Sequence, residues 1–154
     1  AITTDVIVGF PGETPELFDQ TYAFLQEMAP SKIHVFQYSP REGTLAASFS
    51  DQVPKQEKER RSQALIALSD QMGEAFQRQF VHQVVQVLIE RELDGKLVGH
   101  TDNYLQVAVP AVQDGDQLIG KIVNARVVSV STEQVAGILL SDANNKLGVE
   151  GGAK

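Results

Sequence analysis

The chain has 154 residues, of which 42% are hydrophobic and 21% charged, as expected of a globular protein with one or two small cores. Its net charge of −7 argues against a strong nucleic-acid binder, because neutralising phosphates needs clustered Lys and Arg. The apolar runs are too short to cross a bilayer and there is no cysteine for disulfides, so we expect a cytoplasmic protein with no membrane partner.

The first strong pattern is an apolar strand, Asp5 to Val8, followed by a glycine-proline turn and a helix. The strand is apolar and β-branched, which predicts a parallel strand covered on both faces. Gly9 and Gly12 let the backbone turn sharply and approach a ligand, and Thr14 before a proline predicts a helix N-cap. Ligands of α/β proteins gather at the carboxyl ends of strands, so this turn is a candidate site; a plain strand-to-helix turn is the alternative.

A helix is predicted from Pro15 to Met28, because apolar residues recur on one stripe and Pro30 follows. A second strand, Lys32 to Tyr38, completes a strand–helix–strand unit and ends in a polar loop, Ser39 to Thr44. The predicted apolar stripe of the helix consists of Leu17, Phe18, Thr21, Phe24, Leu25 and Met28.

A loop from Leu45 to Val53 precedes a longer predicted helix, from about Pro54 to Phe80. The first half of this helix, Lys55 to Arg61, carries both signs of charge, which is typical of a solvated face with pairs four residues apart. Its predicted apolar stripe consists of Leu65, Leu68, Met72, Phe76 and Phe80.

After Val81 the pattern changes to short β-rich runs separated by turns. Five such runs in about 60 residues predict a small antiparallel barrel of the OB-like kind, which closes to avoid exposed edges. The glycine-rich segment from Asn144 is predicted to be a frayed tail. The predicted strands are Val84 to Glu90, Lys96 to His100, Tyr104 to Val109, Lys121 to Val130 and Val135 to Leu140.

Three segments, TTDVIVGFPGET, HVFQYSPREGTLAA and DQVPKQEKERRSQALIALSDQ, resemble the tRNA methylthiotransferases. These radical S-adenosylmethionine enzymes add a methylthio group to adenosine beside the anticodon, and the resemblance is strongest to the branch acting on threonylcarbamoyladenosine. It runs from roughly Ile2 to Leu140. It implies an α/β part followed by an all-β part: the end of a partial (β/α) barrel in residues 1–52, a connecting helix in 53–80, a TRAM barrel in 81–143 and the tail in 144–154.

The resemblance also implies cofactors that this chain cannot hold alone. The family uses S-adenosylmethionine and 4Fe-4S clusters, and thiolates hold such clusters, whereas this sequence has no cysteine. We therefore expect the clusters in a missing N-terminal part of the enzyme, which receives electrons from a separate donor. By resemblance, the full enzyme cleaves S-adenosylmethionine reductively, abstracts hydrogen near C2 of the modified adenosine and inserts a sulfur that is also methylated. The chain alone is expected to be inactive.

Residues that fall where radical-SAM barrels support the adenosine part of the cofactor follow from the same resemblance. Arg41 is the residue expected to contact a carboxylate or phosphate; pinning its own loop to Glu42 or to a backbone carbonyl is the alternative. Glu13 and Glu42 are expected to cap or to make polar contacts rather than to form an acid/base pair. The implied cofactor-binding residues are Asp5, Ile7, Gly9, Phe10, Gly12 and Glu13, with Tyr38, Ser39 and Arg41 on the neighbouring loop.

The TRAM resemblance implies contact with the anticodon stem-loop of tRNA. Tyr104 would stack on a base, while Thr101 and Asn103 would hydrogen-bond base edges or phosphate; turn and strand roles are the alternatives. We expect no catalytic residue in this chain and no metal site, because its three histidines are widely separated. The predicted RNA-binding residues are Lys96, His100, Thr101, Asn103, Tyr104, Lys121 and Arg126.

Two other functions stay open. One is a stand-alone RNA-binding module in which residues 1–50 are only scaffold. The other is a methylthiotransferase that acts on isopentenyladenosine in tRNA or on a side chain of a ribosomal protein.

Overall fold

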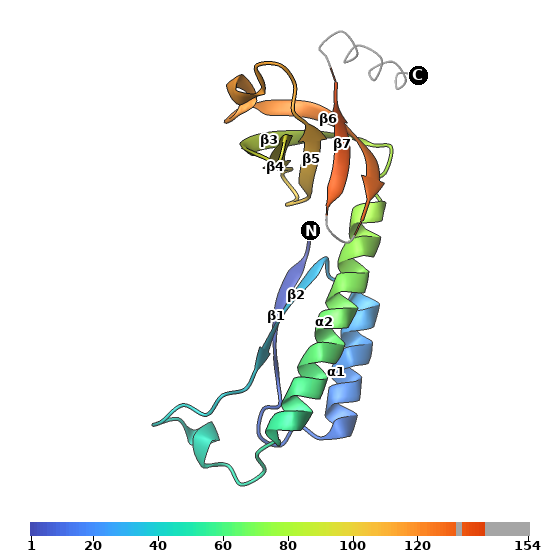
Figure 1. The fold of residues 1–154 in the computed structure, drawn as a ribbon. Coiled ribbons are helices and arrows are strands. Elements are labelled where there is room, and N and C mark those ends of the chain that lie inside the picture. Colours follow the sequence, from blue (N-terminus) through green and yellow to red (C-terminus); the bar gives the residue numbers. More distant parts are fainter. Residues whose placement is uncertain (132–133, 141–154) are drawn as a thin grey trace, which may run out of the picture. The chain divides into compact units, whose positions relative to one another are not determined.

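The computed structural model describes residues 1–131 and 134–140, and Figure 1 shows its fold. The chain divides into two compact units, Ala1–Ala75 and Phe76–Lys154. Each unit has its own hydrophobic core. The segment 144–154, predicted to be a frayed tail, lies outside the described residues.

The first unit begins with the predicted strand–helix–strand motif: β1 (Thr3–Val8), α1 (Pro15–Met28) and β2 (Lys32–Gln37). The two strands pair in parallel, with Thr3 opposite Lys32 and Val8 opposite Gln37. The predicted N-cap is confirmed, because the hydroxyl of Thr14 accepts a hydrogen bond from the Leu17 amide at 3.3 Å. A short 3-10 helix, η1 (Leu45–Ser48), and the long helix α2 (Lys55–Arg78) follow.

The core of the first unit lies between one face of the two-stranded sheet and both long helices. The opposite face of the sheet is open: Ile7 and Phe36 are adjacent in the register and are 56% and 53% exposed. The prediction of a β1 strand covered on both faces is therefore wrong for this chain, because α1 and α2 both pack on the same face. The core residues are Val8, Phe18, Leu25, Ile33, Leu65 and Leu68.

The buried stripe of α1 is narrower than predicted. Phe18 and Leu25 are buried, whereas Leu17, Phe24 and Met28 are exposed. These three side chains lie outside the hydrophobic core that Phe18 and Leu25 form with the sheet and α2. An apolar pattern of period 3.6 identifies the helix but does not fix the width of the face that packs.

The second unit is a closed barrel of five strands, as predicted, together with a short 3-10 helix, η2 (Gly115–Leu118). The barrel order is β3-β4-β5-β7-β6, with β6 pairing back onto β3. Four of the pairs are antiparallel, but β5 and β7 pair in parallel, so the prediction of an antiparallel barrel is wrong there. An odd number of strands cannot close with every neighbour antiparallel, and a mixed barrel is consistent with an OB-like fold. The strands are β3 (Val84–Leu93), β4 (Lys96–His100), β5 (Gln106–Pro110), β6 (Ile122–Val130) and β7 (Val135–Leu139).

The interior of the barrel is filled by aliphatic side chains. Leu105, Val107 and Val109, predicted to form one buried face, are all buried, but the alternation is incomplete because Ala108 between them is buried as well. Gly99 in β4 is needed because a Cβ atom there would lie 1.9 Å from the carbonyl oxygen of Leu88. The other core residues are Val87, Ile89, Leu97, Ala125, Val127 and Val135.

Candidate functional site

The carboxyl ends of β1 and β2 bring the two predicted cofactor loops together. The amide of Tyr38 donates to the carbonyl oxygen of Val8 at 2.9 Å, and the Phe10 and Tyr38 rings meet edge to face with centroids 5.1 Å apart. Asp5 and Ile7 lie on the exposed face of the sheet, at alternate positions of β1. The predicted cofactor residues thus form a continuous region: the open sheet face and the two loops at its end.

The glycines of the first loop are required by the protein itself. Gly9 and Gly12 have φ values of 72° and 86°, a region that L side chains rarely adopt. A Cβ atom on Gly9 would lie 2.2 Å from Cγ of Lys58, and one on Gly12 would lie 2.7 Å from Oδ2 of Asp51. The amide of Gly12 also donates to the carbonyl oxygen of Asp51 at 3.0 Å. The loop is therefore packed closely against the segment that leads into α2.

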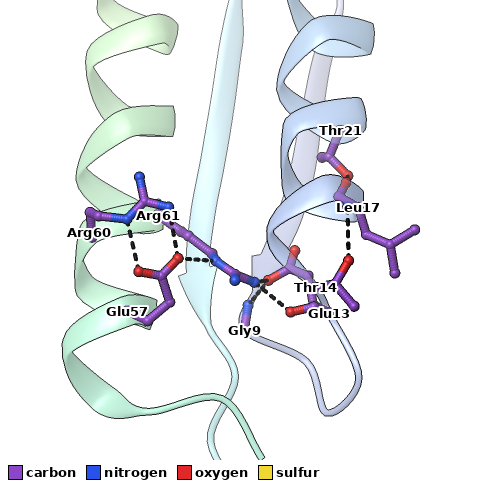
Figure 2. Close-up of polar contacts among 8 residues, drawn as sticks. All are labelled: Gly9, Glu13, Thr14, Leu17, Thr21, Glu57, Arg60 and Arg61. Atoms are coloured by element: carbon purple, nitrogen blue, oxygen red, sulfur yellow. Dashed lines mark hydrogen bonds and ion pairs between the residues drawn. The ribbon is translucent and has the colours of Figure 1, made fainter.

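Glu13 is turned toward its own loop, as Figure 2 shows. Its Oε2 accepts hydrogen bonds from the Gly9 amide at 2.5 Å and from Nη1 of Arg61 at 2.6 Å. The same Arg61 nitrogen donates to the backbone oxygen of Glu13 at 2.8 Å. The carboxylate therefore closes the loop on itself and anchors it to α2.

The charged start of α2 is only partly solvated, so the prediction of a solvated face is wrong at Arg61, whose side chain is 3% exposed. Nε of Arg61 donates to Oε1 of Glu57 at 2.7 Å, while Arg60 holds both oxygens of Glu57 at 2.7 and 2.8 Å. Hydrogen bonds from Arg60 and then Arg61 lower the pKa of Glu57 from 4.5 to about 2. Arg61 thus lies between two carboxylates, Glu57 on its own helix and Glu13 on the loop (Figure 2).

Lys58 holds the second loop from the same helix. Its Nζ donates to the carbonyl oxygen of Tyr38 at 2.9 Å and lies 5.5 Å from the centroid of the Tyr38 ring. Sequence reasoning missed Lys58 and Arg61 as site residues. The mixed charges at the start of α2 indicated ion pairs, but the partners of Lys58 and Arg61 on the loops are 20 and 48 positions away in the sequence. Periodicity along a helix does not identify such distant partners.

The second loop leaves polar groups accessible. Ser39, Arg41 and Glu42 are exposed, and the backbone oxygen of Arg41 accepts from the amide and hydroxyl of Thr44 at 3.2 and 2.7 Å. Within the part of the chain that the structure describes, the buried hydroxyl of Tyr38 has no hydrogen-bond partner. A buried phenol without a partner is costly, so this hydroxyl is an unsatisfied polar group at the end of β2.

In the barrel, the turn from Thr101 to Leu105 presents Tyr104 to solvent. The Thr101 amide donates to the Leu105 carbonyl oxygen at 3.0 Å, and the Leu105 amide donates to the Thr101 hydroxyl at 3.0 Å. That hydroxyl also donates to Oδ1 of Asn103 at 2.5 Å. Tyr104 is 84% exposed with φ of 62°, so it belongs to the turn and not to the strand in which it was predicted.

A groove of about 620 Å³ follows this turn along the outside of β3. Four of the predicted RNA-binding residues line it, His100 among them, and its acidic lining residues are Glu90 and Asp102. Nδ1 of His100 lies 3.0 Å from both carboxylate oxygens of Glu90. Apolar lining comes from Phe80, Val84, Val85, Leu88 and Ile122.

The predicted cationic contacts lie outside the lining of this groove. Lys96 is at the opposite end of β4 from His100, and its Nζ donates to Oε1 of Gln134 at 3.0 Å. Arg126 pairs in register with the lining residue Val84 and donates to the His82 carbonyl oxygen at 3.4 Å. Lys121 is exposed immediately before the lining residue Ile122. The structure thus brings together His100, Thr101, Asn103 and Tyr104, but not Lys96.

Among the described residues there is neither a cluster of metal ligands nor a helix that could cross a membrane. No group of three or more His, Asp or Glu side chains there is arranged to hold a metal ion. No helix among them has the length and apolar character needed to cross a membrane.

Comparison with known proteins decides the family. No family model matches the chain. The chain is 44% identical over 133 residues to the threonylcarbamoyladenosine tRNA methylthiotransferase MtaB of Bacillus subtilis, covering 83% of this chain and 29% of the relative. It is also 38% and 35% identical over 146 residues to the tRNA-2-methylthio-N(6)-dimethylallyladenosine synthases of Geobacillus thermodenitrificans and Bacillus subtilis, covering 93% of this chain and 27% and 28% of those relatives.

The chain belongs to the tRNA methylthiotransferase family. The resemblance carried by the three sequence segments is confirmed. The chain spans less than a third of the length of these relatives, and the matches include both its α/β unit and most of its barrel.

Proposed function

We propose that this chain works within a tRNA methylthiotransferase that adds a methylthio group at C2 of N6-threonylcarbamoyladenosine beside the anticodon. The choice of substrate is supported by sequence identity. The chain is 44% identical to a relative named for threonylcarbamoyladenosine and 35–38% identical to those named for dimethylallyladenosine. The second candidate is the dimethylallyladenosine reaction, which the longer matches over 93% of the chain favour. In either case the enzyme acts on tRNA in the cytoplasm without a membrane partner.

The α/β unit is proposed to support the adenosine part of S-adenosylmethionine. Ile7 and Phe36 form an exposed apolar surface suited to a planar base, and Tyr38 lies on the loop at the end of the same sheet. Arg41 has an exposed guanidinium on the adjoining loop and would contact a carboxylate. The remaining proposed contacts are Asp5, Gly9, Phe10, Gly12, Glu13 and Ser39. When bound, S-adenosylmethionine supplies the radical and the methyl group.

The iron–sulfur clusters are proposed to lie on cysteines outside this sequence, which contains none. Their electrons would come from a separate donor. This chain's own contribution is to bind and orient cofactor and RNA, and we assign it no residue that transfers a proton or electron.

The barrel is proposed to hold the anticodon stem-loop through bases more than through phosphates. Tyr104 presents a ring that is 84% exposed, and stacking on such a ring tolerates any base. The acidic residues Glu90 and Asp102 in the groove disfavour phosphate. Lys121 and Arg126, next to lining residues of the groove, and Lys96, at the far end of β4, are proposed to supply the few phosphate contacts. His100, Thr101 and Asn103 shape the binding turn.

Analysis of tRNA nucleosides tests the proposed function. The complete gene that carries this chain would be expressed in a bacterium lacking its own tRNA methylthiotransferases, and its tRNA digested for mass spectrometry. We expect 2-methylthio-threonylcarbamoyladenosine to appear as its precursor decreases. Methylthiolation of dimethylallyladenosine instead would establish the second candidate. Unchanged tRNA from cells that contain cluster-loaded protein would contradict both, and ribosomal proteins from the same cells would then be analysed.

A further inference from the structure

We propose that Arg61 is a positioning residue for the cofactor: it fixes, through Glu13, the shape of the loop from Gly9 to Glu13. This inference rests on the proposed function, because it assigns the loop to the adenosine part of S-adenosylmethionine. Arg61 does not touch the cofactor in this assignment, since its side chain is 3% exposed and turned toward Glu13 and Glu57.

The surroundings of Arg61 are specialised for a fixed geometry. Its side chain reaches Oε2 and the backbone oxygen of Glu13 through Nη1 and Oε1 of Glu57 through Nε. Burying a guanidinium is costly unless its hydrogen bonds are satisfied, and a well-packed apolar side chain would often stabilise a helix–loop contact equally well. Unlike an apolar contact, the hydrogen bonds of the ion pair are directional, so each of them fixes the position of one acceptor atom.

Glu13 transmits this constraint across the loop. Its Oε2 also accepts from the Gly9 amide, so the two ends of the turn are held by one carboxylate, which is 14% exposed. Gly9 and Gly12 have positive φ values and offer few steric limits of their own, so the loop needs such external bonds to keep one conformation. Loss of Arg61 would leave the Glu13 carboxylate partly buried and unpaired, and we expect it to turn toward solvent and release Gly9.

Lys58 supports the same arrangement one turn earlier on α2. Its aliphatic stem packs where a Cβ of Gly9 would lie, and its Nζ holds the Tyr38 carbonyl oxygen. Lys58 and Arg61 therefore tie both strand-end loops to one helix face. The spacing of the two loops, and with it the position of Phe10 against Tyr38, depends on α2.

The test uses the complete, cluster-loaded enzyme and three variants. Arg61→Met removes the charge but keeps the stem, and Glu13→Gln keeps the shape of the side chain. Arg60→Met is the matched control, because Arg60 is 58% exposed and its ion pair is with Glu57 on its own helix. Equilibrium dialysis gives the affinity for S-adenosylmethionine, steady-state kinetics give KM and kcat, and hydrogen exchange reports the amides of the loop.

We expect Arg61→Met and Glu13→Gln to speed exchange at Gly9 and to weaken S-adenosylmethionine binding on the order of 10-fold, with KM raised and kcat at saturation nearly unchanged. Arg60→Met should alter none of these. Arg61→Lys should fall between, because it restores charge without the second donor.

Faster loop exchange with unchanged S-adenosylmethionine affinity would overturn the proposal while leaving the proposed function intact. Wild-type enzyme that binds no S-adenosylmethionine would instead contradict the proposed function. If Arg61→Met does not fold, Arg61→Lys decides: unchanged affinity in that variant rejects the positioning role, and weakened affinity together with faster exchange at Gly9 supports it.

Discussion

Glu57 illustrates how single side chains at the start of α2 depart from a simple charged surface. Its carboxylate is held by Arg60 on the exposed side and by Arg61 on the buried side. Ion pairs four residues apart on a helix usually contribute little. Here Arg61 also forms an ion pair with Glu13, so the interaction within the helix becomes part of a contact between distant segments.

Glu57 should titrate with a pKa of about 2, well below its ordinary value of 4.5, because Arg60 and Arg61 donate to its charged form. The folded-state pKa is lowered, so the charged carboxylate stabilises the fold above about pH 4.5, and this contribution is lost as the pH falls through about 2. Because solvent screens this partly exposed group, we expect the charged carboxylate to contribute about 1 kcal/mol to the free energy of unfolding. NMR titration of the Glu57 carboxyl carbon measures the pKa, and Arg60→Met should raise it. A titration near 4.5 in the wild type would contradict the network.

Gly99 gives a second prediction, for the barrel. Gly99→Ala would place a Cβ atom 1.9 Å from the Leu88 carbonyl oxygen, so β3 and β4 must separate locally. We expect a loss of about 3 kcal/mol in unfolding free energy. Gly95→Ala is the control, because Gly95 has φ of 71° but nothing within 4 Å of the added atom, and it should cost about 1 kcal/mol through backbone strain alone. Equal losses in urea unfolding would show that the close approach does not matter.

Among the elements, those defined by a local signal were predictable. Thr14 and Pro15 mark the start of α1, and the positive φ of Ala29 ends the helix just before Pro30. β4 has the predicted bounds, and the turn before it contains Asp94 and Gly95 at positive φ. Capping residues and turn glycines act within a few positions, so sequence alone reports them.

Elements whose state depends on distant partners were not predictable in the same way. Ile7 lies in a run of apolar residues, but whether it is covered depends on which face of the sheet the helices pack against. The parallel pairing of β5 and β7 arises because a ring of five strands closes only with at least one parallel pair. Hydrophobic periodicity gives no information on which strands pair. At the candidate site, sequence identified the glycine turn and Tyr104, while Arg61 and Lys58 became visible only through contacts 48 and 20 residues apart.

The turn that carries Tyr104 leads to a prediction about RNA affinity. Tyr104→Asn tolerates the positive φ and should weaken anticodon stem-loop binding by about 1–3 kcal/mol with little change in salt dependence, because stacking releases no counterions. Lys121→Ala should instead flatten the log–log salt slope, which we expect on the order of −2 for about three phosphate contacts. Fluorescence titrations over a salt series measure both. If neither variant differs from the wild type while the barrel remains folded, the RNA contacts lie elsewhere.

For the whole molecule, the absence of cysteine sets a limit on what this polypeptide can do alone. Thiolates hold iron–sulfur clusters, so we expect the isolated chain to bind no stoichiometric iron and to transfer no methylthio group. Iron and sulfide analysis after anaerobic reconstitution checks this. A stoichiometric cluster on the isolated chain would show that other side chains serve as ligands and would remove the need for a separate cluster-binding part.

In the proposed function, the α/β unit binds the cofactor and the barrel binds the tRNA. Hydrogen exchange of the complete enzyme, measured alone, with S-adenosylmethionine and with an anticodon stem-loop, tests both halves in one experiment. We expect S-adenosylmethionine to slow exchange in residues 7–13 and 38–41, and the stem-loop to slow it in residues 100–105. Ligand binding that leaves both regions unchanged, with protection confined to the rest of the enzyme, would contradict the account.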